Sequence, residues 1–251
     1  MRPLVVGNWK MHGTTAFAAE LARGVVEAAR THAAVEVGVA PPFTALHAVR
    51  EVVRGTPVAL CAQHVHHQPQ GAFTGAIAAP MLADLGCSMV LVGHSERRHV
   101  FGETDEQVAQ QLRALLANDL TPILCVGELL AEREAGRTLD VVRTQLDTAL
   151  TDLDEATVRR VVVAYEPVWA IGTGKVARPA DAQEVHAFLR GLLRQRHAEA
   201  VRVMYGGSVK ADNAAGLFAE RDIDGFLVGG ASLKAAEFGG IIAAAAGGKH
   251  G

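Results

Sequence analysis

The chain has 251 residues, of which 49% are hydrophobic and 20% are charged, and its net charge is −3. This length and apolar content suffice for a large core, and the lack of a basic tail or a run of like charges disfavours nucleic-acid and anionic-membrane binding. No apolar stretch approaches the ~20 residues of a membrane span, and none near residue 1 is long enough for a signal peptide.

Eight short apolar runs recur along the chain and predict eight β-strands. Several runs are continuous rather than alternating, which is typical of strands that are covered on both faces in a parallel sheet. The low aromatic content, 5%, disfavours a β-sandwich. The expected strands span residues 4–7, 35–40, 58–62, 88–93, 122–126, 161–165, 201–205 and 225–230.

Longer segments with helical periodicity separate these strands. Apolar residues recur near every 3.6 positions over 17–28, 108–115 and 185–192. We expect Thr104 or Asp105 to begin one helix and Pro179 another. Strands alternating with helices predict right-handed βαβ units and a parallel sheet, and eight units close a (β/α)8 barrel of ~250 residues. We predict an α/β fold with one barrel domain over 1–251; a doubly wound open sheet is the structural alternative.

Polar residues and glycines follow most of the predicted strands. In a barrel these positions share the rim where catalytic groups gather. Each residue alone has a structural explanation, such as a solvated strand end or an ion pair. Their occurrence together at one rim favours a catalytic site. The residues are Asn8, Lys10, Gln63, His94, Ser95, Glu96, Glu128, Glu166, Ser208, Gly229 and Gly230.

The glycine-rich turns at 205–208 and 229–230 favour a phosphate site. Backbone N–H groups of tight turns hold anions, and the loops after strands seven and eight bind phosphate in many barrels. The alternative is that these glycines only permit tight turns. Lys10 is then the main cation that points inward, with Lys210 on the surface. Ser95 is a good N-cap for a short helix, whose N-terminus would keep the neighbouring His94 neutral.

Two other motifs fit less well. Residues 172–177 match the spacing of a dinucleotide-binding turn, but they neither follow a strand directly nor open a helix. His64, His66 and His67 lie in one segment without a companion ligand cluster, so a polar interface or a solvated loop is favoured over a metal site. Three cysteines, Cys61, Cys87 and Cys125, fit no zinc spacing. We expect a cytoplasmic protein without metal or cofactor.

The sequence resembles the triosephosphate isomerase family along essentially its whole length. The resemblance implies a TIM barrel that interconverts dihydroxyacetone phosphate and D-glyceraldehyde 3-phosphate through an enediolate, with no cofactor. It rests on GNWKMHG (7–13), GAFTG (71–75), VGHSERR (92–98), CVGE (125–128), AYEPVWAIGTGK (164–175), YGGSVK (205–210) and DGFLVGGASL (224–233).

The resemblance also implies a role for each site residue. Glu166 would be the base that moves a proton between neighbouring carbons, and His94 would polarise the carbonyl. Lys10 would stabilise the enediolate charge and help to bind the substrate. Asn8 would assist near the substrate oxygens, and Glu96 would orient Lys10 or His94. The N–H groups that would hold the phosphate belong to Gly172, Ser208, Gly229 and Gly230.

A lid is implied directly after Glu166. Its hinges would lie at 167–169 and 175–177, and Gly172 at its tip would reach the phosphate. Closure would press Ile171 and Leu227 around Glu166, raise the pKa of this carboxylate by desolvation and protect the enediolate from water. The lid residues are Pro167, Val168, Trp169, Ala170, Ile171, Gly172, Thr173, Gly174 and Lys175.

The resemblance further implies a homodimer that is formed through segment 64–78. Thr74 would reach towards the catalytic residues of the partner subunit. His64 stands where the family usually has Asn, and Ala76 stands where it usually has Glu, which would remove a carboxylate that pairs with an arginine such as Arg98. We therefore expect a dimer with an altered polar network.

Three other functions remain open at this point. A related isomerase of a four-carbon ketose phosphate would need the same base, imidazole and phosphate site. A non-catalytic binding barrel is disfavoured because Lys10, His94 and Glu166 are all present. A nucleotide-dependent dehydrogenase is disfavoured by the misplaced glycines.

Overall fold

The chain folds into a closed barrel of eight parallel strands. The computed structural model describes residues 1–171 and 177–248. The strands are hydrogen-bonded in the order β1 to β8, and β8 pairs with β1, so the barrel is closed. The predicted TIM barrel is confirmed and the open sheet is excluded. The strands are β1 Leu4–Asn8, β2 Glu36–Ala40, β3 Val58–Ala62, β4 Met89–Val92, β5 Thr121–Val126, β6 Val162–Tyr165, β7 Val203–Tyr205 and β8 Gly225–Val228.

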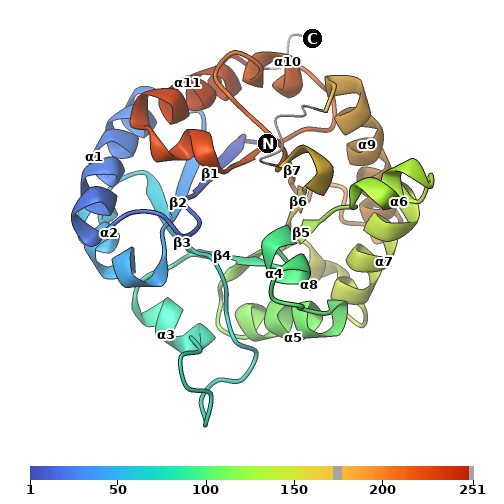
Figure 1. Ribbon diagram of the computed structural model, residues 1–251, viewed down its shortest axis with the longest axis horizontal. Coiled ribbons are helices and arrows are strands. Elements are labelled where there is room, and N and C mark those ends of the chain that lie inside the picture. The colour runs from blue at the N-terminus through green and yellow to red at the C-terminus, as the bar shows by residue number, and fades with distance from the viewer. Residues whose placement is uncertain (172–176, 249–251) are drawn as a thin grey trace.

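Helices form an outer layer around the strands (Figure 1). The α-helices are α1 Thr15–Thr31, α2 Leu46–Val53, α3 Ala79–Asp84, α4 Ser95–His99, α5 Asp105–Leu116, α6 Leu130–Glu134, α7 Thr138–Leu150, α8 Glu155–Val158, α9 Pro179–Gln195, α10 Ala214–Phe218 and α11 Ala235–Ala246. Three 3₁₀-helices are η1 Phe43–Ala45, η2 Val168–Ala170 and η3 Gly230–Leu233. Within the described residues, no helix is both long and apolar enough to cross a membrane.

The alternation of side chains along each strand divides the core in two. In β1, Val5 packs outwards among residues of the helices, whereas Leu4 and Val6 point into the barrel. The inner cluster also contains Cys61 and Cys125, which confirms that these cysteines are small buried side chains. Both faces of the strands are therefore buried, which explains their continuous apolar runs.

Local signals place the helix starts where the sequence predicts them. The Thr104 side chain accepts a hydrogen bond from the N–H of Gln107, whose side chain accepts one from the N–H of Thr104. This capping box begins α5 at Asp105, and Pro179 begins α9. The last predicted strand is two residues too long. Gly229 has ψ −112° and leaves the strand conformation, and Gly230 begins η3.

Candidate active site

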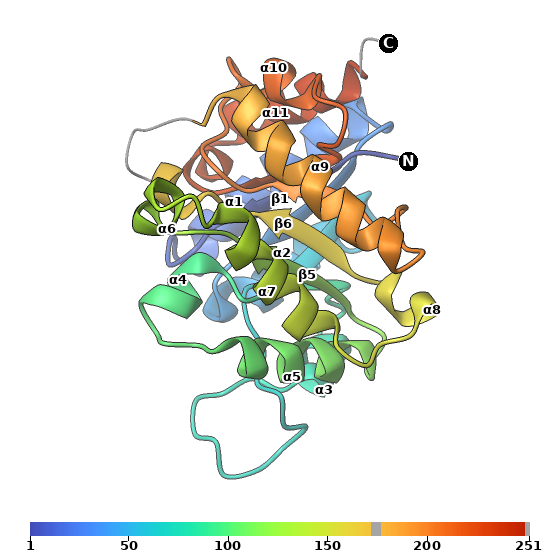
Figure 2. The same ribbon diagram turned by 90° about the vertical axis from the view of Figure 1, so that its right-hand side faces the viewer.

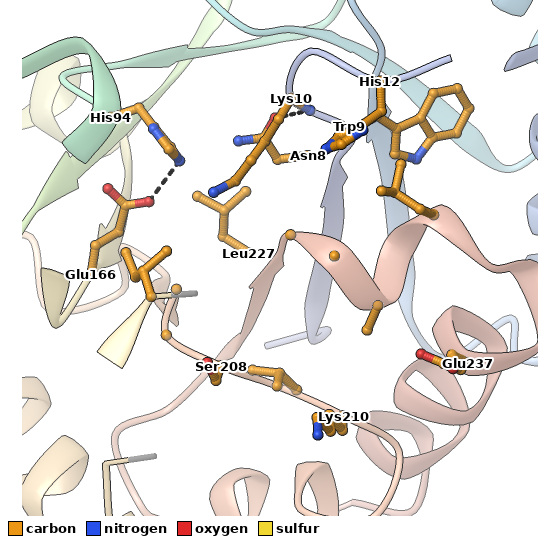
Figure 3. Close-up of a pocket in the computed structure, with 18 of the residues that line it drawn as sticks. Asn8, Trp9, Lys10, His12, His94, Glu166, Ser208, Lys210, Leu227 and Glu237 are labelled. Carbon is orange, nitrogen blue, oxygen red and sulfur yellow. Dashed lines mark hydrogen bonds and ion pairs between the residues drawn. The ribbon is translucent and has the colours of Figure 1, made fainter. Parts of the chain in front are cut away.

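Polar side chains that follow five of the strands line one cavity at the rim of the barrel (Figure 3). The cavity has a volume of about 650 Å³. Every predicted catalytic and substrate-binding residue lines it except Gly172, which lies outside the described residues. These lining residues are Asn8, Lys10, His94, Glu96, Glu166, Ser208, Gly229 and Gly230, together with Ile171 and Leu227.

Lys10 is held at the rim in a backbone conformation that a lysine rarely adopts. Its φ is +50°, in the left-handed region that favours glycine. Its N–H donates to Oδ1 of Asn8 at 3.0 Å, and the side chain of Gln63 donates to the carbonyls of Lys10 and Ala40, both at 2.8 Å. These bonds stabilise the strained turn and direct the amine into the cavity.

Glu96 is the anionic partner of Lys10. The amine Nζ lies 2.6 Å from Oε1 of Glu96, whereas Nδ1 of His94 lies 3.7 Å from Oε2. Burial opposes ionisation of Glu96, but the hydrogen bond and charge of Lys10 outweigh it and lower the pKa of this carboxyl group. Of its two predicted partners, Glu96 therefore contacts Lys10 directly.

Glu166 directly follows β6, and this residue is almost fully buried, at 2% exposure. Its Oε1 lies 3.1 Å from Nε2 of His94, and its Oε2 accepts a hydrogen bond from the N–H of Ser95 at 2.8 Å. Its own N–H donates to the carbonyl of Val126 at 2.8 Å. Both the backbone and the carboxylate of Glu166 are thus fixed against the neighbouring strand ends.

Two glycines make the space that Glu166 occupies. A Cβ at Gly206 would lie 2.9 Å from Cγ of Glu166, and a Cβ at Gly127 would lie 1.7 Å from its carbonyl oxygen. Gly127 and Gly206 follow β5 and β7, the strands on either side of β6. Glycine is required at these two strand ends because a larger residue would displace the carboxylate or its backbone.

The hydrogen bonds of His94 assign its tautomer. Nδ1 accepts the N–H of Glu96 at 3.2 Å, so the proton of the neutral ring resides on Nε2, which faces Glu166. The predicted N-cap is wrong by one residue, because His94 itself caps α4 and Ser95 is the first residue of the helix. As the first residue of α4, Ser95 has a backbone N–H without a partner inside the helix, and this N–H donates to Glu166.

The predicted phosphate end lies across the cavity from His94. Asn213 fixes the turn after β7, since it accepts the N–H of Lys210 at 2.8 Å and donates to the carbonyl of Ser208 at 3.2 Å. The backbone at Gly229 lies beside the Lys10 side chain. Lys210 is exposed, as predicted, at the edge of the cavity. Lys234, which the sequence reasoning did not single out, also lies at this edge.

The described part of the lid is anchored by a buried carboxylate. Glu128 is fully buried, and it accepts hydrogen bonds from Nε1 of Trp169 at 2.8 Å and from the Tyr165 hydroxyl at 3.1 Å. The guanidinium of Arg133 lies 4.6 Å from the centre of the Trp169 ring. Ala170 accepts a hydrogen bond from the Ser208 hydroxyl at 2.7 Å. Gly172, Thr173, Gly174 and Lys175 lie outside the described residues.

The sequence places Gln63 and Glu128 among the rim residues, but it suggested no role for either side chain. Both follow a predicted strand directly, which is the signal that marked the other rim residues. Their partners, Lys10 and Trp169, are more than 40 residues away in the chain in each case, so only the closed barrel brings them together.

Segment 64–78 projects from the barrel next to α3 (Figures 1 and 2). At its base, Nε2 of His64 lies 2.6 Å from Oε1 of Glu103, which also accepts hydrogen bonds from Arg97. Burial opposes ionisation of Glu103, but the bonds from His64 and Arg97 outweigh it and lower its pKa to about 2. Thr74 lies exposed near the tip of the segment.

Arg98 has a partner in spite of Ala76. Its guanidinium pairs with Asp105 and donates to the carbonyl of Gly93 at 2.7 Å. The substitution at position 76 therefore leaves no unpaired arginine at this place. Within the described residues, no group of three or more His, Cys, Asp or Glu is arranged to hold a metal ion.

Comparisons with known proteins agree with this geometry. A sequence model of the family "Triosephosphate isomerase" matches residues 3–245. The triosephosphate isomerase of Roseiflexus sp. (strain RS-1) is 54% identical over 240 residues, which cover 94% of each chain. That of Moorella thermoacetica is 52% identical over 247 residues, which cover 96% of this chain and 98% of the relative. That of Pseudomonas aeruginosa (strain LESB58) is 54% identical over 248 residues, which cover 97% of this chain and 98% of the relative.

Proposed function

The chain belongs to the triosephosphate isomerase family, and we propose that Glu166 and His94 carry the proton transfers of its reaction. The protein is an isomerase that interconverts dihydroxyacetone phosphate and D-glyceraldehyde 3-phosphate. The carboxylate of Glu166 takes a proton from the carbon beside the carbonyl and returns it to the neighbouring carbon. The observation that carries this assignment is a buried carboxylate 3.1 Å from Nε2 of His94 inside the cavity.

His94 acts as the electrophile in its neutral form. Its Nε2–H donates to the substrate oxygen that gains negative charge in the enediolate, and the acceptor role of Nδ1 keeps the proton on Nε2. A neutral imidazole can then pass this proton between the two substrate oxygens. In the structure Nε2 faces Glu166, so the substrate enters between the two side chains and replaces this contact.

Lys10 supplies the positive charge for the enediolate and for the phosphate. Its amine enters the cavity beside Gly229, and Asn8 and Gln63 fix the turn that carries it. Backbone N–H groups of Ser208, Gly229 and Gly230 complete the phosphate site. Glu96 positions the amine through their 2.6 Å ion pair.

The lid after Glu166 closes over the bound substrate and desolvates the carboxylate. The Trp169 and Ala170 contacts with Glu128 and Ser208 hold the first hinge in the state described here. When the lid closes, Ile171 and Leu227 press on Glu166. Exclusion of water raises the pKa of this carboxylate and makes it a stronger base.

The active unit is a homodimer that is built on segment 64–78, with Thr74 near the catalytic residues of the partner subunit. The base of the segment contacts two rim loops, because Gln63 binds Lys10 and His64 binds Glu103. Large apolar side chains on those loops and on the segment are exposed, namely Met11, Phe73, Val100 and Phe101. A second copy that covered them would remove apolar surface from water. An ultracentrifugation experiment that finds a fully active monomer would refute this arrangement.

We place the protein, as one domain over 1–251, in the cytoplasm. Its reaction belongs to glycolysis, and its three cysteines are buried thiols, as in reducing compartments.

A coupled assay tests the function as a whole. The rate with D-glyceraldehyde 3-phosphate is measured beside the rate with a four-carbon ketose phosphate, for the wild type and for Glu166→Gln. We expect kcat/KM near the diffusional ceiling of ~10⁸ M⁻¹s⁻¹ for the triose and loss of this activity in the variant. A higher rate with the four-carbon substrate, or an active variant, would contradict the proposal.

A further inference from the structure

A second cavity lies at the opposite end of the barrel, where the strands begin. Its volume is about 490 Å³, and its lining residues come from the starts of β1, β2, β5, β6 and β7 and from the end of α8. Figure 2 shows α8 and the N-terminus on the side of the barrel away from α4 and α6, which flank the catalytic rim. The charged side chains that line this cavity are Arg2, Glu36, Asp119, Arg159, Arg160 and Arg202.

Positive charge predominates in this second cavity. Four guanidinium groups and the Met1 amine face only two carboxylates, although the protein as a whole has a net charge of −3. Such a local excess of one sign is not a consequence of composition. In the cavity wall it attracts small anions over about a Debye length, ~8 Å at physiological ionic strength.

Backbone carbonyls fix the positions of the guanidinium groups. Arg160 donates to the carbonyl of Leu116, the last residue of α5, at 3.1 Å. Arg159 donates to the carbonyl of His197 just after α9 at 2.8 Å, and Arg2 is tied in the same way to the segment after α1. Arginines that donate hydrogen bonds to the carbonyls at helix C-termini stabilise those helices. The same bonds also hold the guanidinium groups in fixed positions. A guanidinium carries five N–H donors, and Arg160 bonds to both Leu116 and Asp119 through the single nitrogen Nη2.

Three carboxylates pair with these arginines, and all are weak competitors for a ligand. Glu155, beside the cavity, pairs with Arg159 at 2.5 Å and its side chain is 47% exposed. Asp119 is 97% exposed and bonds to Arg160 at 3.1 Å, and Glu36 pairs with Arg202 at 2.5 Å while its side chain remains 36% exposed. Exposed ion pairs contribute little because water and salt screen them. A multivalent anion that contacts several guanidinium groups at once can therefore displace these carboxylates.

We propose that this arginine-lined cavity is a binding site for a small oligophosphate, an anion with at least two linked phosphate groups. Guanidinium groups bind phosphate oxygens in paired, charge-assisted hydrogen bonds. A single phosphate would fill only a small part of the cavity, whereas a chain of phosphates could contact several of the guanidinium groups that line it at once. The site lies apart from Lys10 and Glu166, so a ligand here and a substrate at the rim bind at the same time.

Isothermal titration with inorganic tripolyphosphate tests the proposal. The titration is run on the full chain in saturating triose phosphate, which occupies the catalytic cavity. Arg159→Gln/Arg202→Gln removes two cavity charges, and Arg50→Gln/Arg54→Gln removes two charges from a neighbouring pocket at the same end of the barrel. We expect binding to the wild type, at least tenfold weaker binding to the first variant, and a change of less than about twofold in the second. Unchanged isomerase activity shows that each variant is folded.

Three results would overturn the proposal. These are no binding to the wild type, binding that disappears when triose phosphate is added, and equal weakening in both double variants, which would indicate diffuse charge attraction. Should the double variant fail to fold, Arg159→Gln alone serves, because the Arg159 side chain is 53% exposed and tolerates replacement. The single variant must then weaken binding at least threefold.

Discussion

The two ends of the barrel differ in the backbone groups and the charged side chains that they present. At the catalytic end, the parallel arrangement of strands and helices presents helix N-termini and their N–H groups, and the carboxylate of Glu166 is buried among them. Glu166 and His94 each have defined partners there. At the other end, helix C-termini present carbonyl groups, which arginines satisfy, and the charged side chains are partly exposed with an excess of guanidinium groups.

This difference teaches where charge acts most strongly. A buried carboxylate interacts through a medium of low effective dielectric, so a small displacement has a large effect on chemistry. An exposed ion pair is screened, so its loss changes little unless several charges act on one ligand. Matched substitutions at the two ends of the barrel test this contrast.

The largest effect is expected for Glu166→Asp. The change retracts the carboxylate by about one methylene, and a misplacement of ~1 Å costs ~100-fold in rate. We expect kcat in the coupled assay to fall by about this factor while KM changes little. The matched change at the other end is Glu155→Asp, where the carboxylate pairs with Arg159 at 2.5 Å and is half exposed. A near-normal kcat in Glu166→Asp would exclude Glu166 as the catalytic base.

A smaller loss is expected for Gly206→Ala. The new methyl group would lie 2.9 Å from Cγ of Glu166, so the carboxylate must move while its chemistry is retained. We expect kcat to fall by roughly tenfold, as part of the ~100-fold loss that a full ångström would cause. Gly191→Ala is the control, because no atom outside the backbone of α9 and the two neighbouring residues lies within 4 Å of the new methyl group.

The control variant Gly191→Ala should itself be more stable than the wild type. Alanine is favoured over glycine inside a helix, so Gly191→Ala should stabilise the fold by about 0.5–1 kcal/mol and leave kcat unchanged. Steady-state kinetics and urea denaturation of both variants provide the comparison. Equal activities would mean that Gly206 is not needed to position Glu166.

Glu96→Gln tests whether a partly exposed charge counts at the catalytic end. The glutamine keeps an acceptor for Lys10 but removes the negative charge that holds the amine at 2.6 Å. Because the pair is not deeply buried, we expect kcat/KM to fall severalfold, less than for the buried carboxylate. Glu237→Gln breaks a similar pair with Lys234 at the edge of the same cavity and should have no effect. An unchanged kcat/KM in Glu96→Gln would show that the backbone turn alone positions Lys10.

The sequence was sufficient to predict the barrel and most of the rim, because strand periodicity and the position after a strand are local signals. The contacts that give the rim its chemistry are not local. The N–H of Ser95 binds Glu166, which is 71 residues later, and Glu128 binds Trp169 after 41 residues. The residue preferences for N-caps favoured Ser95 at the start of α4. They do not include histidine, although the His94 ring caps this helix. In the second cavity, Arg2, the adjacent pair 159–160 and Arg202 are likewise far apart in sequence, and only closure of the barrel gathers them.

The smallest effect is expected for Arg202→Gln at the other end. The substitution breaks the 2.5 Å pair with Glu36, but both side chains are partly exposed, so the free energy of unfolding should change by less than about 1 kcal/mol. Urea denaturation measures this change, and the coupled assay should give wild-type kcat. A loss above about 2 kcal/mol would mean that the pair behaves as a buried one, whose broken partner is left desolvated. The contrast between the two ends would then rest on position relative to the substrate and no longer on burial.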